Sequence, residues 1–171
     1  MTLLKKKIKM IIAAAVIALA AAVLFIPSQN RLCVMRGGQL LFAETIEEGG
    51  YFSIRYNHSV NRSPVVDTVE YTPDGELPLT VRTSLYQTFG AGIPIAEDGG
   101  TLKATEDGLL LSGIDRTYKQ IDLMTGTYAD HYLITESGEH QLKAIAGEQK
   151  HITISVGKLS LFSLIMFNLS I

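Results

Sequence analysis

The sequence predicts an all-β fold: a compact antiparallel sandwich or barrel of about 8–11 short strands, preceded by one N-terminal transmembrane helix. Two observations predict the strands. After Pro27, turn residues recur about every 8–12 residues, and the segments between them alternate apolar and polar side chains or are rich in β-branched residues. A third observation predicts the helix, because a long apolar run follows a cluster of lysines at the start of the chain.

The apolar run begins at Met10 and ends at Ile26, and it contains no charged or polar side chain. Four lysines precede it: Lys5, Lys6, Lys7 and Lys9. At about 1.5 Å per residue the run is about 25 Å long, which is close to the lower limit for crossing a bilayer. Because lysines stay on the cytoplasmic side, we expect a single-pass protein of the cell membrane with a cytoplasmic N-terminus and an extracytoplasmic domain.

Cleavage is the alternative to a retained anchor. The three alanines at positions 20–22 offer a signal-peptidase site, and a chain cut there would be secreted. The cut would leave the apolar residues 23–26 at the new N-terminus, so the sequence favours retention. We therefore predict a signal-anchor or transmembrane segment at 1–27, a linker at 28–37 and an extracytoplasmic β domain at 38–171.

The charge of the chain is unevenly distributed. The whole chain carries −2, but four of its 15 Lys and Arg precede the apolar run, so the other 11 stand against 17 Asp and Glu and leave the domain at −6. An acidic domain argues against nucleic acid or an anionic lipid surface as a partner. Cys33 is the only cysteine, which excludes an internal disulfide and suggests a small buried side chain.

The first predicted strands follow the anchor in order. Residues 39–44 end at a Glu-Gly-Gly turn. Residues 51–59 alternate well, since Phe52, Ile54 and Tyr56 fall on one face. Residues 65–72 are rich in β-branched side chains and end at a Pro-Asp-Gly turn, and residues 79–89 alternate again before a glycine-rich segment.

The second half of the domain predicts shorter strands. Residues 101–104 and 109–112 flank an Asp-Gly turn and suggest a hairpin. Four further short strands are predicted at 118–124, 131–135, 141–146 and 151–156, separated by glycine-containing turns. The apolar tail 159–171 is predicted as a final core strand, with an interfacial or partner-docking segment as the alternative.

The densest polar cluster connects two of the predicted strands. It contains the candidate binding residues His58, Ser59, Asn61, Arg62 and Ser63, with Asp67 in the following strand and with Gly90 and Gly92 in the glycine-rich segment. A recognition surface is one interpretation, because binding groups often lie on such loops. The other is a polar loop whose side chains satisfy the backbone.

Two chemical alternatives involve these residues and neighbouring carboxylates. His58 as base, a serine as nucleophile and Asp67 as orienting group would make a hydrolase, but neighbouring strand residues point to opposite faces. Carboxylates at Asp67, Glu70, Glu97 and Asp98 could serve a calcium- or small-ligand-binding module, although they lack EF-hand spacing. We therefore predict no catalytic residue, no metal site and no cofactor.

Two stretches together resemble the paired motifs of a small bacterial family. They are YNHSVNRSPVVD at 56–67 and FGAGIP at 89–94, and the family is the domain-of-unknown-function family numbered eighteen-fifty. Asp67 stands where the family motif has glutamate, a position that Glu70 could fill instead. The resemblance extends over about 38–156.

The resemblance implies a function that the residues alone do not. Members of the family resemble one another in having an N-terminal membrane segment and a small exported domain. Many are encoded near tripartite solute (TRAP) transporters of the TAXI type. The resemblance therefore implies a non-catalytic accessory role, in contact with the transporter permease or its substrate-binding protein.

Overall fold

The computed structural model describes residues 2–60, 62–88 and 100–169, with side chains from residue 6 onward except that of residue 20. The chain divides into two compact units. The first contains residues 1–30 and 158–171, and the second runs from Arg31 to Gly157. The second unit holds the β domain.

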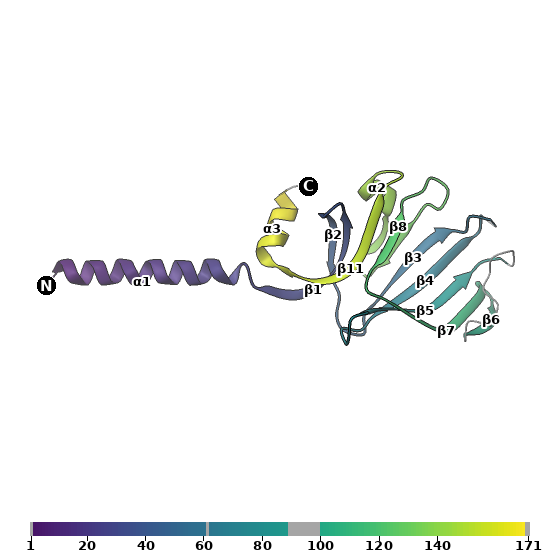
Figure 1. Ribbon diagram of the computed structural model, residues 1–171, viewed down its shortest axis with the longest axis horizontal. Coiled ribbons are helices and arrows are strands. Elements are labelled where there is room, and N and C mark those ends of the chain that lie inside the picture. Colours follow the sequence, from purple (N-terminus) through teal and green to yellow (C-terminus); the bar gives the residue numbers. More distant parts are fainter. Residues whose placement is uncertain (1, 61, 89–99, 170–171) are drawn as a thin grey trace. The chain divides into compact units, whose positions relative to one another are not determined.

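The first unit contains two helices. Helix α1 covers Thr2–Val23, and helix α3 covers Leu161–Leu169 (Figure 1). Among the described residues, no helix combines the length and the apolar character that crossing a membrane requires.

The tail differs from its prediction, because α3 replaces the expected core strand. Strand β11 ends at Ser160, whose hydroxyl accepts a hydrogen bond from the amide of Ser163 at 3.2 Å. That contact is an N-cap, and the leucines and methionine after it, which are not branched at Cβ, favour a helix over a strand.

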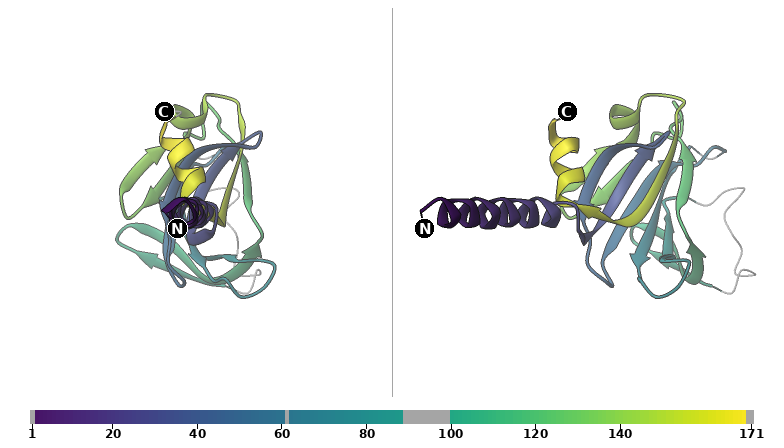
Figure 2. Two further views of the ribbon diagram at one scale, coloured as in Figure 1. Left: turned by 90° about the vertical axis from the view of Figure 1, so that its left-hand side faces the viewer. Right: turned by 60° about the vertical axis from the view of Figure 1, so that its left-hand side comes forward.

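The second unit contains two antiparallel sheets that form a sandwich, as predicted (Figure 1 and Figure 2). The smaller sheet has the order β2-β1-β11-β8, with β1 at Pro27–Arg36, β2 at Gln39–Thr45, β8 at Ile121–Met124 and β11 at His151–Ser160. The segment 28–37, expected as a linker, therefore forms most of β1.

The larger sheet has seven strands in the order β10-β9-β3-β4-β5-β7-β6. Their bounds are β3 Tyr51–Asn57, β4 Pro64–Tyr71, β5 Leu79–Tyr86, β6 Thr101–Thr105, β7 Gly108–Tyr118, β9 Tyr132–Thr135 and β10 Gly138–Gln141. Strand β7 is much longer than the predicted 109–112, because its residues 113–115 bulge opposite a single residue of β5 and the pairing resumes at Arg116 and continues to Tyr118.

The predicted strand at 141–146 is wrong. A short helix, α2, covers Leu142–Ala146 instead. Leu142 and Ala146 are both buried, and a spacing of four residues places them on one face of a helix, whereas a strand would need alternation.

The main core lies between the inward faces of the two sheets. Its buried members come from both sheets, from the β2–β3 connection and from helix α2: Leu32, Val34, Ile46, Phe52, Ile54, Val69, Tyr71, Leu79, Leu133, Leu142, Ala146, Ile152 and Ile154. Cys33 is also buried, as predicted, and burial raises the pKa of its thiol to about 11. A thiol with that pKa is a weak nucleophile at neutral pH.

A second, smaller core lies farther along the large sheet. It consists of Val65, Tyr86, Leu109 and Leu111. On strand β4, Val65 belongs to this small core and Val69 to the main one, while Asp67 lies between them on the same face. A carboxylate thus interrupts the apolar face of the sheet.

Candidate functional site

The polar loop predicted as a binding element connects β3 to β4. The amide of His58 donates to the carbonyl of Ser63 at 2.9 Å, and the amide of Arg62 donates to the carbonyl of His58 at 2.9 Å. His58 Nδ1 accepts a further hydrogen bond from the amide of Val60 at 3.3 Å. These contacts fold the loop on itself and fix the direction in which its side chains leave the sheet.

The end of β3 holds a second loop beside the first. The amide of Asn57 donates to the carbonyl of Ala129 at 2.7 Å, and its side-chain Nδ2 donates to the carbonyl of Tyr128 at 3.4 Å. The connection between β8 and β9, residues 125–131, is therefore placed next to the connection between β3 and β4. We call the first the Tyr128 loop and the second the His58 loop.

The two loops enclose an open pocket of about 870 Å³, which we call the His58 pocket. It is lined by Asn57, His58, Ser59, Arg62, Met124, Gly126, Thr127, Tyr128, Ala129 and Gln149. Three predicted binding residues, His58, Ser59 and Arg62, thus come together there.

The other predicted residues lie elsewhere. Ser63 is buried and contributes its backbone carbonyl to the loop rather than a side chain to the pocket. Asp67 lines a different cavity. Asn61, Gly90 and Gly92 lie outside the described residues.

The rim of the pocket is aromatic, apolar and cationic. Tyr128 is 82% exposed, Met124 is about half exposed, and Arg62 is exposed beside them. Tyrosine, methionine and arginine are enriched at protein interfaces, where a large side chain fills a pocket on the partner. The composition of the rim therefore suits recognition of another protein.

Backbone strain is concentrated at this pocket. Arg62 and Gln149 line it with φ angles of 54° and 53°, and Asp130 adjoins it with a φ of 44°. Non-glycine residues in this region persist only where the surrounding structure holds them, and they cluster at functional sites. The Asp130 carboxylate contacts Lys143 Nζ at 2.8 Å and accepts from Gln141 at 2.9 Å, which holds that residue in place.

A buried threonine fixes the far wall of the pocket. Thr125 is 1% exposed, donates its hydroxyl to the carbonyl of Gly147 at 2.6 Å and accepts the amide of Lys150 at 3.0 Å. The amide of Gln149 donates to the Thr125 carbonyl at 2.6 Å. One side chain therefore ties the Tyr128 loop to the turn that carries Gln149.

Asp67 is held on the inward face of β4 by two hydroxyls. Ser84 donates to Asp67 Oδ1 at 2.5 Å, and the hydroxyl of Tyr56 donates to the same carboxylate. Burial raises the pKa of Asp67 above its ordinary value, although these hydrogen bonds and the charge of Arg116 oppose the shift. Burial also raises the pKa of Tyr56, and the neighbouring Asp67 adds to that effect.

These contacts bear on the catalytic alternative. A triad needs a carboxylate that orients the imidazole, but Asp67 orients Ser84 and Tyr56 on the inward face of the sheet. The Nδ1 atom of His58, where such a carboxylate would bind, accepts the amide of Val60. The hydrolase hypothesis therefore gains no geometric support.

Asp67 also lines a cavity of about 200 Å³ between the two sheets. Its walls are Ile54, Asp67, Val69, Val81, Tyr118, Gln120, Ile121 and Asp122. Apolar side chains form about half of its walls, and its charged groups are the partly buried carboxylate of Asp67 and the exposed carboxylate of Asp122.

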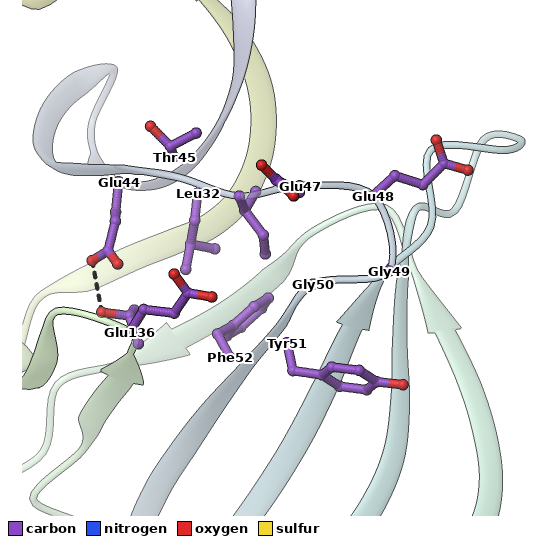
Figure 3. A pocket seen from close by; sticks show the side chains of 12 residues that line it. Leu32, Glu44, Thr45, Glu47, Glu48, Gly49, Gly50, Tyr51, Phe52 and Glu136 are labelled. Atoms are coloured by element: carbon purple, nitrogen blue, oxygen red, sulfur yellow. Dashed lines mark hydrogen bonds between the residues drawn. The ribbon is translucent and has the colours of Figure 1, made fainter.

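A third hollow, of about 500 Å³, was not predicted from the sequence. Figure 3 shows four glutamates around it: Glu44, Glu47, Glu48 and Glu136. Burial alone would raise the pKa of Glu44, but hydrogen bonds from Ser137 and Thr135 outweigh it and lower that pKa. Glu44 thus serves to join β2 to the β9–β10 turn.

The described residues contain no group of three or more His, Cys, Asp or Glu side chains placed to hold a metal ion. Of the carboxylates considered for calcium, Asp67 and Glu70 fall on opposite faces of β4, and Glu70 contacts Arg82 at 2.5 Å. Glu97 and Asp98 lie outside the described part of the chain.

A family model described as a domain of unknown function (DUF1850) matches residues 52–142, more than half of the chain. The chain belongs to the DUF1850 family. The resemblance noted in the sequence is thereby confirmed. No curated protein and no solved structure shows significant similarity to it. The DUF1850 match includes Asp67 and every lining residue of the His58 pocket except Gln149.

Sequence reasoning found one side of this pocket and missed the other. The His58 loop stood out because its polar residues are contiguous. Met124, Thr125 and Tyr128 gave no comparable signal, since a Thr-Gly pair between two short strands indicates only a turn.

The role of Thr125 predicts a loss of stability on removal of its hydroxyl. Thr125→Val keeps the shape of the side chain but leaves the Gly147 carbonyl unpaired, so the free energy of unfolding should fall by about 1–3 kcal/mol. Urea unfolding measures the change. The exposed Thr127→Val is the matched control and should stay within about 0.5 kcal/mol of wild type. Equal effects of the two variants would refute the assigned role.

The raised pKa of Asp67 predicts a specific pH dependence. The folded state holds the Asp67 proton more tightly than the unfolded chain, so the stability contributed by this carboxyl falls as pH rises from the unfolded pKa through the folded pKa. Asp67→Asn does not titrate and should lack this decline. Urea unfolding of both proteins from about pH 4 to about pH 7 tests it, and parallel stability curves would contradict it.

Proposed function

We propose that this DUF1850 protein is a non-catalytic, membrane-anchored, extracytoplasmic recognition protein. It acts as an accessory of a TAXI-type TRAP solute transporter and contacts the permease or the substrate-binding protein through the His58 pocket. The observation that carries the proposal is the pocket itself, in which the motif residues His58 and Ser59 and the neighbouring Arg62 meet the exposed side chains of Met124 and Tyr128.

The membrane part of the proposal rests on the N-terminal segment. Four lysines precede an uncharged run from Met10 to Ile26, and the apolar side chains of α1 are exposed, with Leu19 at 70%. Exposed apolar surface of this extent is costly in water. A membrane would cover it, and the lysines would keep the N-terminus in the cytoplasm.

The transporter part rests on the family. The family resemblance implies a membrane segment, an exported domain and a frequent genomic neighbourhood with TAXI-type transporters. Genomic neighbourhood suggests a partner but no chemistry. The pocket supplies the chemistry of contact, because its aromatic, thioether and guanidinium groups are those that anchor protein interfaces.

The proposal predicts a loss of binding without a loss of folding. The double variant His58→Ala with Arg62→Ala removes an imidazole and a guanidinium from the pocket, and truncation of interface anchors costs about 2 kcal/mol or more each. Co-purification of the transporter component with the detergent-solubilised protein should therefore fall sharply, while the thermal unfolding midpoint stays close to wild type.

The control for this experiment removes two charges elsewhere. Lys103 and Lys119 are exposed, and neither lines the pocket. The variant Lys103→Ala with Lys119→Ala should co-purify the transporter component as wild type does. If the His58 and Arg62 variant also captures the transporter at the wild-type level, the pocket is not the contact site.

A second candidate function is small-ligand binding, and one observation favours it. The cavity beside Asp67 combines apolar walls with a partly buried carboxylate, which suits a small protonated amine with an apolar body. Hydrogen bonds from Ser84 and Tyr56 fix the carboxylate in advance of binding.

Thermal unfolding with n-butylamine tests the second candidate, with butyrate as a probe of similar size and opposite charge. A specific site stabilises the fold by about 2.7 kcal/mol at a hundredfold excess over the dissociation constant. Only the amine should raise the unfolding midpoint, and Asp67→Asn should abolish the rise. An unchanged midpoint, or equal shifts with both probes, would exclude an amine site at this cavity.

A further inference from the structure

The C-terminal helix α3 is apolar on all sides. Its nine residues contain no charged side chain, and only Ser163 and Asn168 are polar. None of the nine is buried, and Leu169 is 77% exposed. A helix without a polar face is typical of a protein interior or a membrane, not of a surface in contact with water.

Helix α3 is tied to the end of the apolar N-terminal run. The amide of Phe162 donates to the carbonyl of Leu24 at 2.8 Å. The rings of Phe25 and Phe162 lie 4.6 Å apart between centroids, with 30° between their planes. The exposed side chains of Phe25, Ile26 and α3 therefore belong to one structural unit.

The surface of α3 favours lipid over a protein partner. A partner that binds one face of a helix leaves the opposite face in water. Here both faces are apolar: Leu161, Ile165 and Leu169 are exposed on one side, and Leu164 and Phe167 are partly exposed on the other. Acyl chains can cover several sides of a helix at once. At about 1.5 Å per residue, α3 is roughly 14 Å long, less than half of a hydrocarbon core of about 30 Å.

The residues next to α3 fit the boundary between headgroups and acyl chains. Lys158 is exposed at the end of β11, three residues before the helix. A lysine at this depth can extend its amine toward the phosphate groups while its methylenes stay in apolar surroundings. The two polar residues of α3, Ser163 and Asn168, are uncharged, so seating the helix among acyl chains would bury no charge.

We propose that α3 is a lipid-contacting helix, seated at the membrane interface where the N-terminal apolar run ends. The inference rests on the proposed membrane anchor and extends it, because it gives the chain a second lipid contact from its opposite terminus. Two contacts bind a membrane more firmly than one and restrict the rotation of the chain about the anchor.

Single tryptophans test the inference directly, because the chain contains no tryptophan of its own. The full-length protein carries Ile165→Trp in α3, Ile17→Trp in α1 or Tyr51→Trp in the β domain, near Glu47 and Glu48. Leu169→Trp is a second α3 reporter in case Ile165→Trp fails to fold. Each variant is reconstituted into phosphatidylcholine vesicles whose acyl chains carry bromine, a contact quencher.

The expected result is quenching of the α3 and α1 reporters and unchanged emission from Tyr51→Trp. Bromine near the headgroup end of the chains should quench Ile165→Trp more than bromine near the methyl end. Quenching of Ile17→Trp without quenching of either α3 reporter would overturn this inference and leave the anchor standing. Absence of quenching at both α1 and α3 would overturn this inference and the membrane anchor together. A blue-shifted but unquenched α3 reporter would also overturn the inference, because it would show that protein, not lipid, covers the helix.

Discussion

The apolar faces of the two sheets must cover each other, and the rest of the β domain depends on that constraint. Because strand side chains alternate, a slip of one residue in β4 would turn Val65 and Val69 outward and bring Thr68 and Glu70 into the core. The register between β3 and β4 is therefore strongly specified. It also fixes where the connecting loop leaves the sheet, since Asn57 pairs with Pro64.

The same register places Asp67 inside the sandwich, and the fold accommodates it with specific partners. Asp67 pairs in register with Ser84 on β5 and with Ile54 on β3, and the hydroxyl of Tyr56 reaches it from the same strand as Ile54. An unpaired buried carboxylate would be far more costly than a hydrogen-bonded one. Asp67 therefore separates two apolar cores while it supplies a preorganised charged group to the cavity between the sheets.

The position of the His58 pocket follows from backbone pairing rather than from its own side chains. The Asn57 amide joins β3 to the Tyr128 loop, and Thr125 joins that loop to the turn at Gly147. Side chains on the rim, such as Arg62 and Tyr128, stay exposed and are free of any role in the core. A rigid base with exposed aromatic and cationic groups is what a recognition surface requires.

Much of this arrangement could be predicted from local sequence. The alternation of Phe52 and Ile54 gave β3, and contiguous polar residues gave the loop that contains His58. The helical tail escaped prediction because an apolar run can be strand or helix, and its N-cap at Ser160 is a single hydroxyl. The other wall of the pocket could not be predicted either, because Tyr128 is brought to the same pocket as His58 only by contacts between segments distant in the chain.

Contact between the His58 pocket and the transporter is the proposal on which the functional conclusion depends. The most direct measurement places a photo-cross-linking amino acid at Tyr128, on the rim, and at Tyr51, which is also exposed but does not line the pocket, and irradiates native membranes. We expect an adduct with the permease or the substrate-binding protein from position 128 and none from position 51. No adduct at position 128, or the same adduct from both positions, would contradict the proposal.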